Sequence, residues 1–174
     1  NLDALDESAV QEADPFLEKL LVEACCELAD TPWVEGMQDM GAAGLLCSTS
    51  EVVVRGREKT KKNLGAKVFL NRVPTKARNM SPVEMLLSES QERMLIVGHR
   101  THRNDILGVF RRWDLEACVI GTVTSDGMYT TVYDTPSKKN VALSMKFSDI
   151  LPDIREEWES KPWKPQRTKH RKAP

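Results

Sequence analysis

The sequence contains no hydrophobic run close to the roughly 18 residues that a membrane-spanning helix requires. Its first residues also lack the basic and then apolar pattern of a secretory signal peptide. The four cysteines include no C-x-x-C pair, the spacing typical of zinc and redox sites. These absences argue against a membrane protein and against a disulfide-stabilised scaffold. We therefore expect a cytoplasmic protein with reduced, partly buried thiols and no membrane partner.

The composition is that of one globular domain with charged ends. The 174 residues are 40% hydrophobic and 29% charged, and about 100–200 residues are typical of one domain. The first 30 residues hold nine acidic side chains and one basic one, whereas the last 14 hold six basic and no acidic ones. We expect an acidic lead-in segment over residues 1–13, a domain over 14–153, and a basic, proline-containing tail or linker over 154–174.

The two ends of the chain bear on its partners and its origin. A basic end can bind nucleic acid, but three prolines and a lack of apolar periodicity favour a linker, so we expect no nucleic-acid partner. The chain starts at Asn1 rather than Met, which indicates a domain excised from a longer protein.

Helix and strand patterns alternate over the predicted domain. Asp14 is placed to cap a first helix with Pro15 at its first position, and Ser81 with Glu84 forms a capping box before a second apolar run. Helices alternate with strands early and hairpins follow late, which predicts an α+β fold with a mixed β-sheet and packed helices. The expected helices span 14–30, 43–54, 81–90 and 101–114; the expected strands span 33–38, 66–73, 92–99, 116–124, 128–134 and 140–147, with a basic loop at 55–65 and a hairpin turn at 125–127.

One motif, MQDMGAAGL at residues 37–45, places a single carboxylate, Asp39, between a strand and a glycine turn that opens a helix. The glycines allow a ligand to approach the backbone, and the amides of the helix N-terminus suit an anion such as phosphate. A carboxylate beside them is suited to hold Mg²⁺. On spacing alone, two other interpretations stay open: Asp39 caps the helix while the glycines pack it on the sheet, or it is an ordinary surface aspartate.

A second motif, LSESQERM at residues 87–94, lies between a capped helix and a strand. Glu89, Ser90 and Gln91 offer a carboxylate, a hydroxyl and an amide in succession, which suit hydrogen bonds to a ribose or to an amide-bearing ligand. The alternative is a polar loop in which Glu92 and Arg93 form an exposed pair.

No catalytic residue is predicted. His99 and His102 lack a third partner for a metal site, and neither has a carboxylate and a nucleophile at a recognisable spacing. Ser48 and Ser50 lie in a Ser/Thr-rich patch without the G-x-S-x-G pattern of a nucleophile elbow.

Together, QDMGAAGL and LLSESQERML resemble the phosphoribosylformylglycinamidine synthase family of purine biosynthesis. The likeness is to the C-terminal-type domain of its first half, which is shared with aminoimidazole ribonucleotide synthetase. It runs in order from VQEADPFLEKLLVEA (10–24) to WDLEACVIGTVTSDG (113–127), about two-thirds of the chain. Two departures are the Glu12-Ala13 pair, where the family usually has a small apolar residue and glycine, and REKTKK (57–62), which resembles a surface insertion.

The resemblance implies a fold, a reaction and site residues. The fold is aminoimidazole ribonucleotide synthetase C-terminal-domain-like. The family converts formylglycinamide ribonucleotide, ATP and glutamine-derived ammonia into formylglycinamidine ribonucleotide, ADP and phosphate. Asp39 is similar to the family's Mg²⁺ ligand, Glu89, Ser90 and Gln91 are similar to its substrate-contacting triplet, and Gln11 matches a substrate-binding glutamine.

The family's catalytic histidine, most of its Mg²⁺ carboxylates and its ATP-binding elements belong to a domain that this sequence does not contain. The resemblance therefore implies a ligase fragment that is inactive alone and works with the remaining domains or subunits, including a glutaminase. An isolated domain with exposed former-interface surface is also able to form a homodimer. Two alternatives are an ATP-dependent kinase of the same superfamily, against which the SESQ triplet argues, and a non-catalytic binding module with a nucleic-acid-binding tail.

Overall fold

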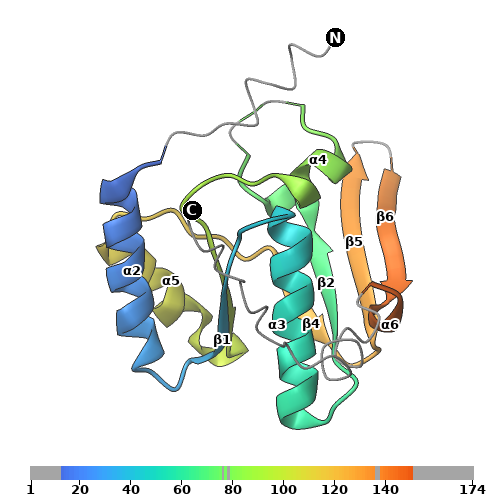
Figure 1. Cartoon of the computed structure of the whole chain (residues 1–174), viewed down its shortest axis with the longest axis horizontal. Coiled ribbons are helices and arrows are strands. Elements are labelled where there is room, and N and C mark those ends of the chain that lie inside the picture. The colour runs from blue at the N-terminus through green and yellow to red at the C-terminus, as the bar shows by residue number, and fades with distance from the viewer. Residues whose placement is uncertain (1–12, 76, 78, 136–137, 151–174) are drawn as a thin grey trace, which may run out of the picture.

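The computed structural model describes residues 13–75, 77, 79–135 and 138–150, and the structural statements below concern these residues (Figure 1). The predicted lead-in, including Gln11, lies outside them except for residue 13, and so does the predicted tail. The helices are α2 (Pro15–Ala29), α3 (Gly44–Thr60), α4 (Pro82–Leu87), α5 (Arg103–Arg112) and α6 (Phe147–Ile150), with 3₁₀ turns at Leu70–Arg72 and Arg100–His102; the strands are β1 (Val34–Asp39), β2 (Gly65–Phe69), β3 (Met94–Gly98), β4 (Gly121–Thr124), β5 (Met128–Thr135) and β6 (Lys138–Lys146). None of the described helices is both long enough and apolar enough to span a bilayer.

The described strands form two sheets rather than the single sheet that the sequence predicted. β1 and β3 form an antiparallel pair, and a four-stranded sheet has the order β4-β2-β5-β6. In the larger sheet β2 is parallel to β5 and antiparallel to β4, so its mixed character is confirmed. The α+β class with packed helices is confirmed as well.

The predicted hairpin at residues 125–127 is wrong. β4 and β5 are not neighbours, because β2 lies between them and pairs with both. The turn therefore carries the chain across the end of β2. An antiparallel hairpin does follow, but it joins β5 to β6 (Figure 1).

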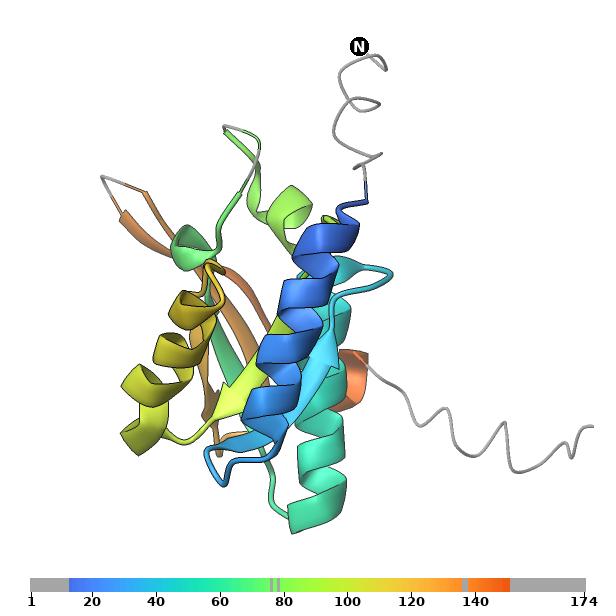
Figure 2. The same ribbon diagram turned by 90° about the vertical axis from the view of Figure 1, so that its left-hand side faces the viewer.

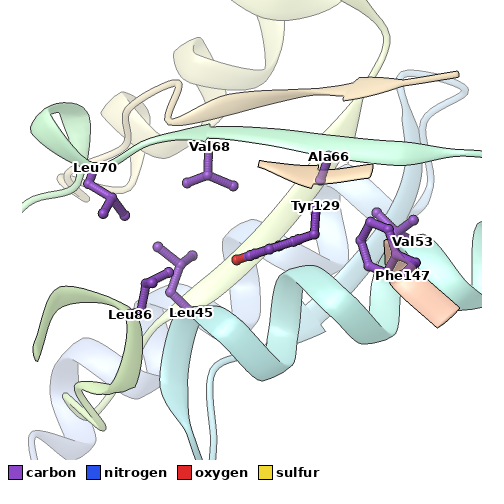
Figure 3. Close-up of a cluster of buried hydrophobic side chains, with 8 residues drawn as sticks. All are labelled: Leu45, Val53, Ala66, Val68, Leu70, Leu86, Tyr129 and Phe147. Atoms are coloured by element: carbon purple, nitrogen blue, oxygen red, sulfur yellow. The ribbon is translucent and has the colours of Figure 1, made fainter. Parts of the chain in front are cut away.

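Helix α3 lies between the two sheets (Figure 1). One of its sides packs on the larger sheet through a hydrophobic cluster, and another contacts β1 and β3. Toward the larger sheet it packs in a cluster in which Tyr129 and Phe147 meet edge to face (Figure 3). On the other side of β1 and β3, α2 and α5 lie together and close a second cluster (Figure 2). The first cluster comprises Leu45, Val53, Ala66, Val68, Leu70, Leu86, Tyr129 and Phe147; the second comprises Ala24, Leu28, Ile106, Val109, Phe110 and Leu115.

Local capping explains where two helices begin. The carboxylate of Asp14 accepts hydrogen bonds from the N–H groups of Phe16 (3.1 Å) and Leu17 (2.9 Å), as the sequence predicted. The capping box before α4 is also confirmed: Ser81 and Glu84 each accept from the other's backbone N–H. Both signals act within three residues, which is why the sequence alone shows them.

Helix α3 is longer than predicted and takes up the first part of the expected loop at 55–65. Arginine, glutamate and lysine are good helix formers, and Glu51 and Arg55 add an ion pair at 3.7 Å one turn apart. The helix ends at Thr60, and the next residue, Lys61, adopts a left-handed conformation with φ of 58°. The predicted insertion at 57–62 therefore begins as the last turn of a helix rather than as a loop.

Candidate functional site

Asp39 is the last residue of β1, and its side chain is exposed. Its backbone pairs with Met94 of β3, and its Oδ1 accepts a hydrogen bond from Nε2 of Gln38 at 2.8 Å. Helix α3 begins after Ala43, and no side chain of the cap residue closes its N-terminus. Asp39 makes no hydrogen bond to the first turn of α3 among the described residues, so the helix-cap interpretation is wrong.

The carboxylate that does close this helix comes from the second motif. Oε1 of Glu89 accepts a hydrogen bond from the backbone N–H of Ala43 at 3.0 Å, across 46 residues of sequence. A carboxylate at a helix N-terminus satisfies a backbone donor that has no partner within the helix, and it interacts favourably with the helix dipole. Glu89 therefore has a structural role that the sequence did not reveal.

The glycine turn of the first motif fits tightly against the second motif. Gly44 has φ of 49°, and a Cβ added there would collide with the backbone carbonyl oxygen of Ser88. Only glycine combines that left-handed conformation with the absence of a side chain. The two motifs, which lie far apart in sequence, are thus packed backbone to backbone at the start of α3.

Arg93 holds the loop of the second motif. Its Nε donates to the carbonyl oxygen of Ser90 at 3.2 Å, and its Nη2 donates to that of Ser88. Burial lowers the pKa of the Arg93 guanidinium from its usual value. The alternative interpretation of an exposed Glu92–Arg93 pair is wrong, because the side chain of Arg93 is half-buried and bonds to backbone carbonyls of its own loop.

The predicted site residues of both motifs line one cavity of about 690 Å³ between α2, the end of β1 and the loop before β3. Asp39, Glu89, Ser90 and Gln91 all border it, so the structure brings these four residues together. Gln11, the fifth predicted site residue, lies outside the described residues. The other lining residues are Glu18, Leu21, Val22, Cys25, Cys26 and Ala29 of α2, Met37, Met40, Gly41 and Ala42 around β1, and Glu92, Arg93 and Met94.

The lining of this cavity combines an apolar wall with an acidic rim. Helix α2 and β1 supply aliphatic and sulfur-containing side chains, while Glu18 and Glu92 add to the carboxylates of Asp39 and Glu89. Among the described residues that line the cavity, the one cationic side chain, Arg93, is engaged with backbone carbonyls. The cavity thus suits an uncharged ligand group that forms hydrogen bonds, or a cation; an anionic group needs a bound cation beside it.

A second hollow of about 280 Å³ lies on the other side of Asp39, facing α3. Its lining includes Gln38, Cys47, Ser48 and Glu51. The Cys47 thiol donates to Oε1 of Glu51 at 3.3 Å, and burial, then Glu51 and then Asp39, raise the pKa of this thiol. This environment disfavours the thiolate form that a nucleophilic cysteine requires. The spacing of four residues on one helix was the sequence signal for this contact.

His99 and His102 make separate contacts. Nε2 of His99 lies 2.8 Å from Oε1 of Glu35, and Nδ1 of His102 lies 3.0 Å from Oδ2 of Asp105. Within the described ranges, no three His, Cys, Asp or Glu side chains are grouped so that they could hold a metal ion. A metal ion at Asp39 would therefore need ligands from outside the described residues, from water or from substrate.

Comparison with known proteins gives a consistent family assignment. Residues 1–134 match the family described as AIR synthase related protein, C-terminal domain. The subunit PurL of phosphoribosylformylglycinamidine synthase from Chlorobium luteolum is 54% identical over 118 residues, which are 68% of this chain and 15% of that protein. The corresponding subunit from Thermoanaerobacter sp. (strain X514) is 42% identical over 149 residues, 86% of this chain and 20% of its own length. This chain therefore spans a fifth or less of these relatives.

Solved structures of PurL show the same fold. T. maritima PurL complexed with FGAR is 38% identical with a TM-score of 0.71 and covers 81% of this chain and 22% of its own. The complex of T. maritima PurL with ATP has a TM-score of 0.70 at the same identity, with 80% and 22% covered. E. coli HypE, a hydrogenase maturation protein, is 15% identical with a TM-score of 0.56 over 71% of this chain and 38% of its own, a likeness of fold alone.

Proposed function

Because the chain belongs to the AIR synthase related protein, C-terminal domain family, we propose that it forms one wall of the ligand site of a phosphoribosylformylglycinamidine synthase. The full reaction joins formylglycinamide ribonucleotide to glutamine-derived ammonia at the expense of ATP. Since the chain spans only 15% of one relative and 20% of another, the reaction requires parts of the enzyme beyond this chain. Those parts include the ATP-binding elements and a glutaminase.

One observation carries the proposal: Asp39 and the Glu89–Gln91 triplet line the same cavity. The hydroxyl of Ser90 and the amide of Gln91 are suited to donate and accept hydrogen bonds with the uncharged amide and ribose groups of formylglycinamide ribonucleotide. The complex of T. maritima PurL with FGAR supports this choice of ligand. Gln11 is proposed as a further substrate-binding residue.

The acidic rim fits a Mg²⁺ ion. Mg²⁺ takes hard oxygen ligands, and it is commonly held by one or two carboxylates together with substrate phosphates and water. Asp39 is exposed at the cavity, and Gly41 lies beside its Oδ2: a Cβ added at Gly41 would be in van der Waals contact with that oxygen, at 3.4 Å. When bound, the ion supplies the positive charge that a phosphate needs beside these carboxylates. ATP is proposed as the nucleotide, held mainly by the parts of the enzyme outside this chain.

Contacts among the described residues hold this part of the site in place. Glu89 joins the loop to α3, and the aliphatic side chains of α2 and β1 reduce the access of water to a bound substrate. We propose that the folded domain extends over residues 14–153, that the protein works in the cytoplasm, and that the isolated domain can form a homodimer through surface that faces other domains in a complete synthase.

Two assays test the proposal. In a thermal-unfolding assay, formylglycinamide ribonucleotide with Mg²⁺ raises the unfolding temperature of the chain, because a ligand that binds only the folded state stabilises it. The variant Gln91→Ala loses most of this shift. In a ligase assay with ATP, Mg²⁺, ammonia and the ribonucleotide, the chain alone gives no turnover. Robust turnover, or no ligand-induced shift at any concentration, contradicts the proposal.

The same purified chain also tests the alternative function, in which the basic tail binds nucleic acid. Binding driven by phosphate contacts weakens steeply as salt rises. Tight, salt-sensitive binding of an oligonucleotide that is lost when residues 161–174 are removed favours the alternative over the proposed ligand site.

A further inference from the structure

Arg93 belongs to the second motif and also contacts the residue that follows the end of β1 in the first motif. Its backbone carbonyl oxygen accepts a hydrogen bond from the N–H of Met40 at 3.1 Å, immediately after the end of β1. Its side chain donates from Nε to the carbonyl oxygen of Ser90 at 3.2 Å and from Nη2 to that of Ser88. One residue therefore ties the end of β1 to the loop that precedes β3.

The local backbone allows this arrangement. Glu92 has φ of 55°, an uncommon conformation for a residue with a side chain, and the chain turns there between the loop and β3. The guanidinium of Arg93 forms no ion pair with a carboxylate in the part of the chain that the structure describes. Its charge acts on two carbonyl oxygens instead, and hydrogen bonds from a charged donor are stronger than neutral ones.

The loop that Arg93 holds determines where α3 starts. The carbonyl of Ser88, one of the two acceptors, packs directly on Gly44, and the next residue, Glu89, accepts the hydrogen bond from Ala43. A shift of this loop would remove support from the glycine turn and alter the shape of the cavity. The same loop carries the three residues of the proposed substrate-contacting triplet.

We propose that Arg93 is a positioning residue that fixes the distance between Asp39 and the Glu89–Gln91 triplet and so sets the affinity of the cavity for its ligand. The planar guanidinium reaches two carbonyl oxygens at once, whereas a lysine ammonium is a single compact charge on a flexible stem. Arg93→Lys therefore keeps the charge but loses the two-point support. The identity of the ligand, but not the role of Arg93, rests on the proposed function.

Amide hydrogen exchange followed by NMR tests the structural part of this inference. In Arg93→Lys we expect the N–H of Ala43 to exchange at least about tenfold faster than in the wild type, because its acceptor becomes mobile. The N–H of Phe69, which bonds to the carbonyl of Ile120 at 2.7 Å in the larger sheet, serves as an internal reference and stays unchanged. Unchanged exchange at Ala43 in a folded variant overturns the inference.

The matched control is Arg111→Lys. Arg111 also donates from Nε to a backbone carbonyl, that of Leu107 at 3.4 Å, but it lies on the exposed face of α5 away from the cavity. We expect this variant to leave exchange at Ala43 and ligand affinity as in the wild type. An equal effect of the two variants contradicts a specific role for Arg93.

Ligand affinity tests positioning separately from stability. We expect the Kd of formylglycinamide ribonucleotide with Mg²⁺ to rise about tenfold in Arg93→Lys, equivalent to 1.4 kcal/mol, while the Tm changes by only a few degrees. Unchanged affinity together with a lowered Tm overturns positioning and leaves a purely structural role. If the wild type itself binds no ribonucleotide, the proposed function fails, but the exchange experiment still decides whether Arg93 holds the loop.

A measurement on the wild type covers the case in which Arg93→Lys does not fold. The Nε–H proton of Arg93 is expected to exchange with solvent far more slowly than that of Arg111, since the former is half-buried and bonded to Ser90. Similar exchange rates for the two protons overturn the inference.

Discussion

The side chain of Glu89 accepts a hydrogen bond from the backbone N–H of Ala43 at 3.0 Å, and this bond joins the two motifs that line the main cavity. It replaces the side-chain cap that α3 lacks at its own N-terminus. The same carboxylate thus closes a helix and borders the proposed substrate site. Its contribution to folding can be separated from its contribution to binding.

Removing this carboxylate weakens the fold. Glu89→Ala is expected to lower the free energy of unfolding by about 1 kcal/mol, the usual cost of losing a helix cap. Glu89→Gln costs less, because an amide oxygen still accepts the hydrogen bond and only the charge beside the helix dipole is lost. Urea unfolding measures both. The control is Glu92→Gln in the same loop, which leaves stability unchanged; equal stability of Glu89→Ala and the wild type contradicts the capping role.

The contact between Gly44 and Ser88 predicts a larger effect from one methyl group. Gly44→Ala is expected to lower the free energy of unfolding by at least about 2 kcal/mol, because the residue is left-handed and its Cβ meets a backbone oxygen. Gly108→Ala is the control, since a Cβ there meets only Nη1 of Arg112 at 4.0 Å within α5. That variant is expected to gain about 0.5–1 kcal/mol. Comparable values for the two variants would show that the glycine turn is not tightly packed.

Tyr129 makes the stability of the fold depend on alkaline pH. Burial raises the pKa of Tyr129 to about 12, while its hydrogen bond with Thr49 (2.8 Å) acts in the opposite direction. Because the folded pKa lies above the value of about 10 in the unfolded chain, stability is complete below pH 10 and declines as pH rises toward 12. Denaturant unfolding between pH 9 and about 12 should show a smaller decline for Tyr129→Phe. The same decline in both proteins excludes Tyr129 as its source.

The sequence predicts those parts of the fold whose causes are local. Asp14 and the Ser81–Glu84 capping box locate α2 and α4 because each cap acts within three residues. The hairpin at residues 125–127 was mispredicted, because the insertion of β2 between β4 and β5 depends on pairing between distant segments. Sequence periodicity carries no information about such pairing.

The sequence likewise predicted some features of the candidate site and not others. The motifs identified Asp39 and the triplet, and the structure places all four residues around one cavity. The sequence did not reveal the capping bond of Glu89 or the support from Arg93, because both connect a side chain to a backbone atom whose position is set by the fold. The roles of the site residues in binding stay predictions.

The exposure of Asp39 predicts that this residue matters for binding rather than for folding. Asp39→Asn keeps the shape of the side chain and the possibility of a hydrogen bond with Gln38, so its free energy of unfolding should lie within about 0.5 kcal/mol of the wild type. Urea unfolding checks this value. A much larger loss of stability would assign Asp39 a structural role.

Calorimetric titration of formylglycinamide ribonucleotide into the chain, with and without Mg²⁺, tests most directly whether Asp39 and the triplet form one ligand site. We expect Mg²⁺ to tighten binding to the wild type and to Asp114→Asn, an exposed control outside both cavities, but not to Asp39→Asn. We also expect Gln91→Ala to weaken binding with or without the ion. Binding that is equally dependent on Mg²⁺ in Asp39→Asn and in the wild type would contradict the account.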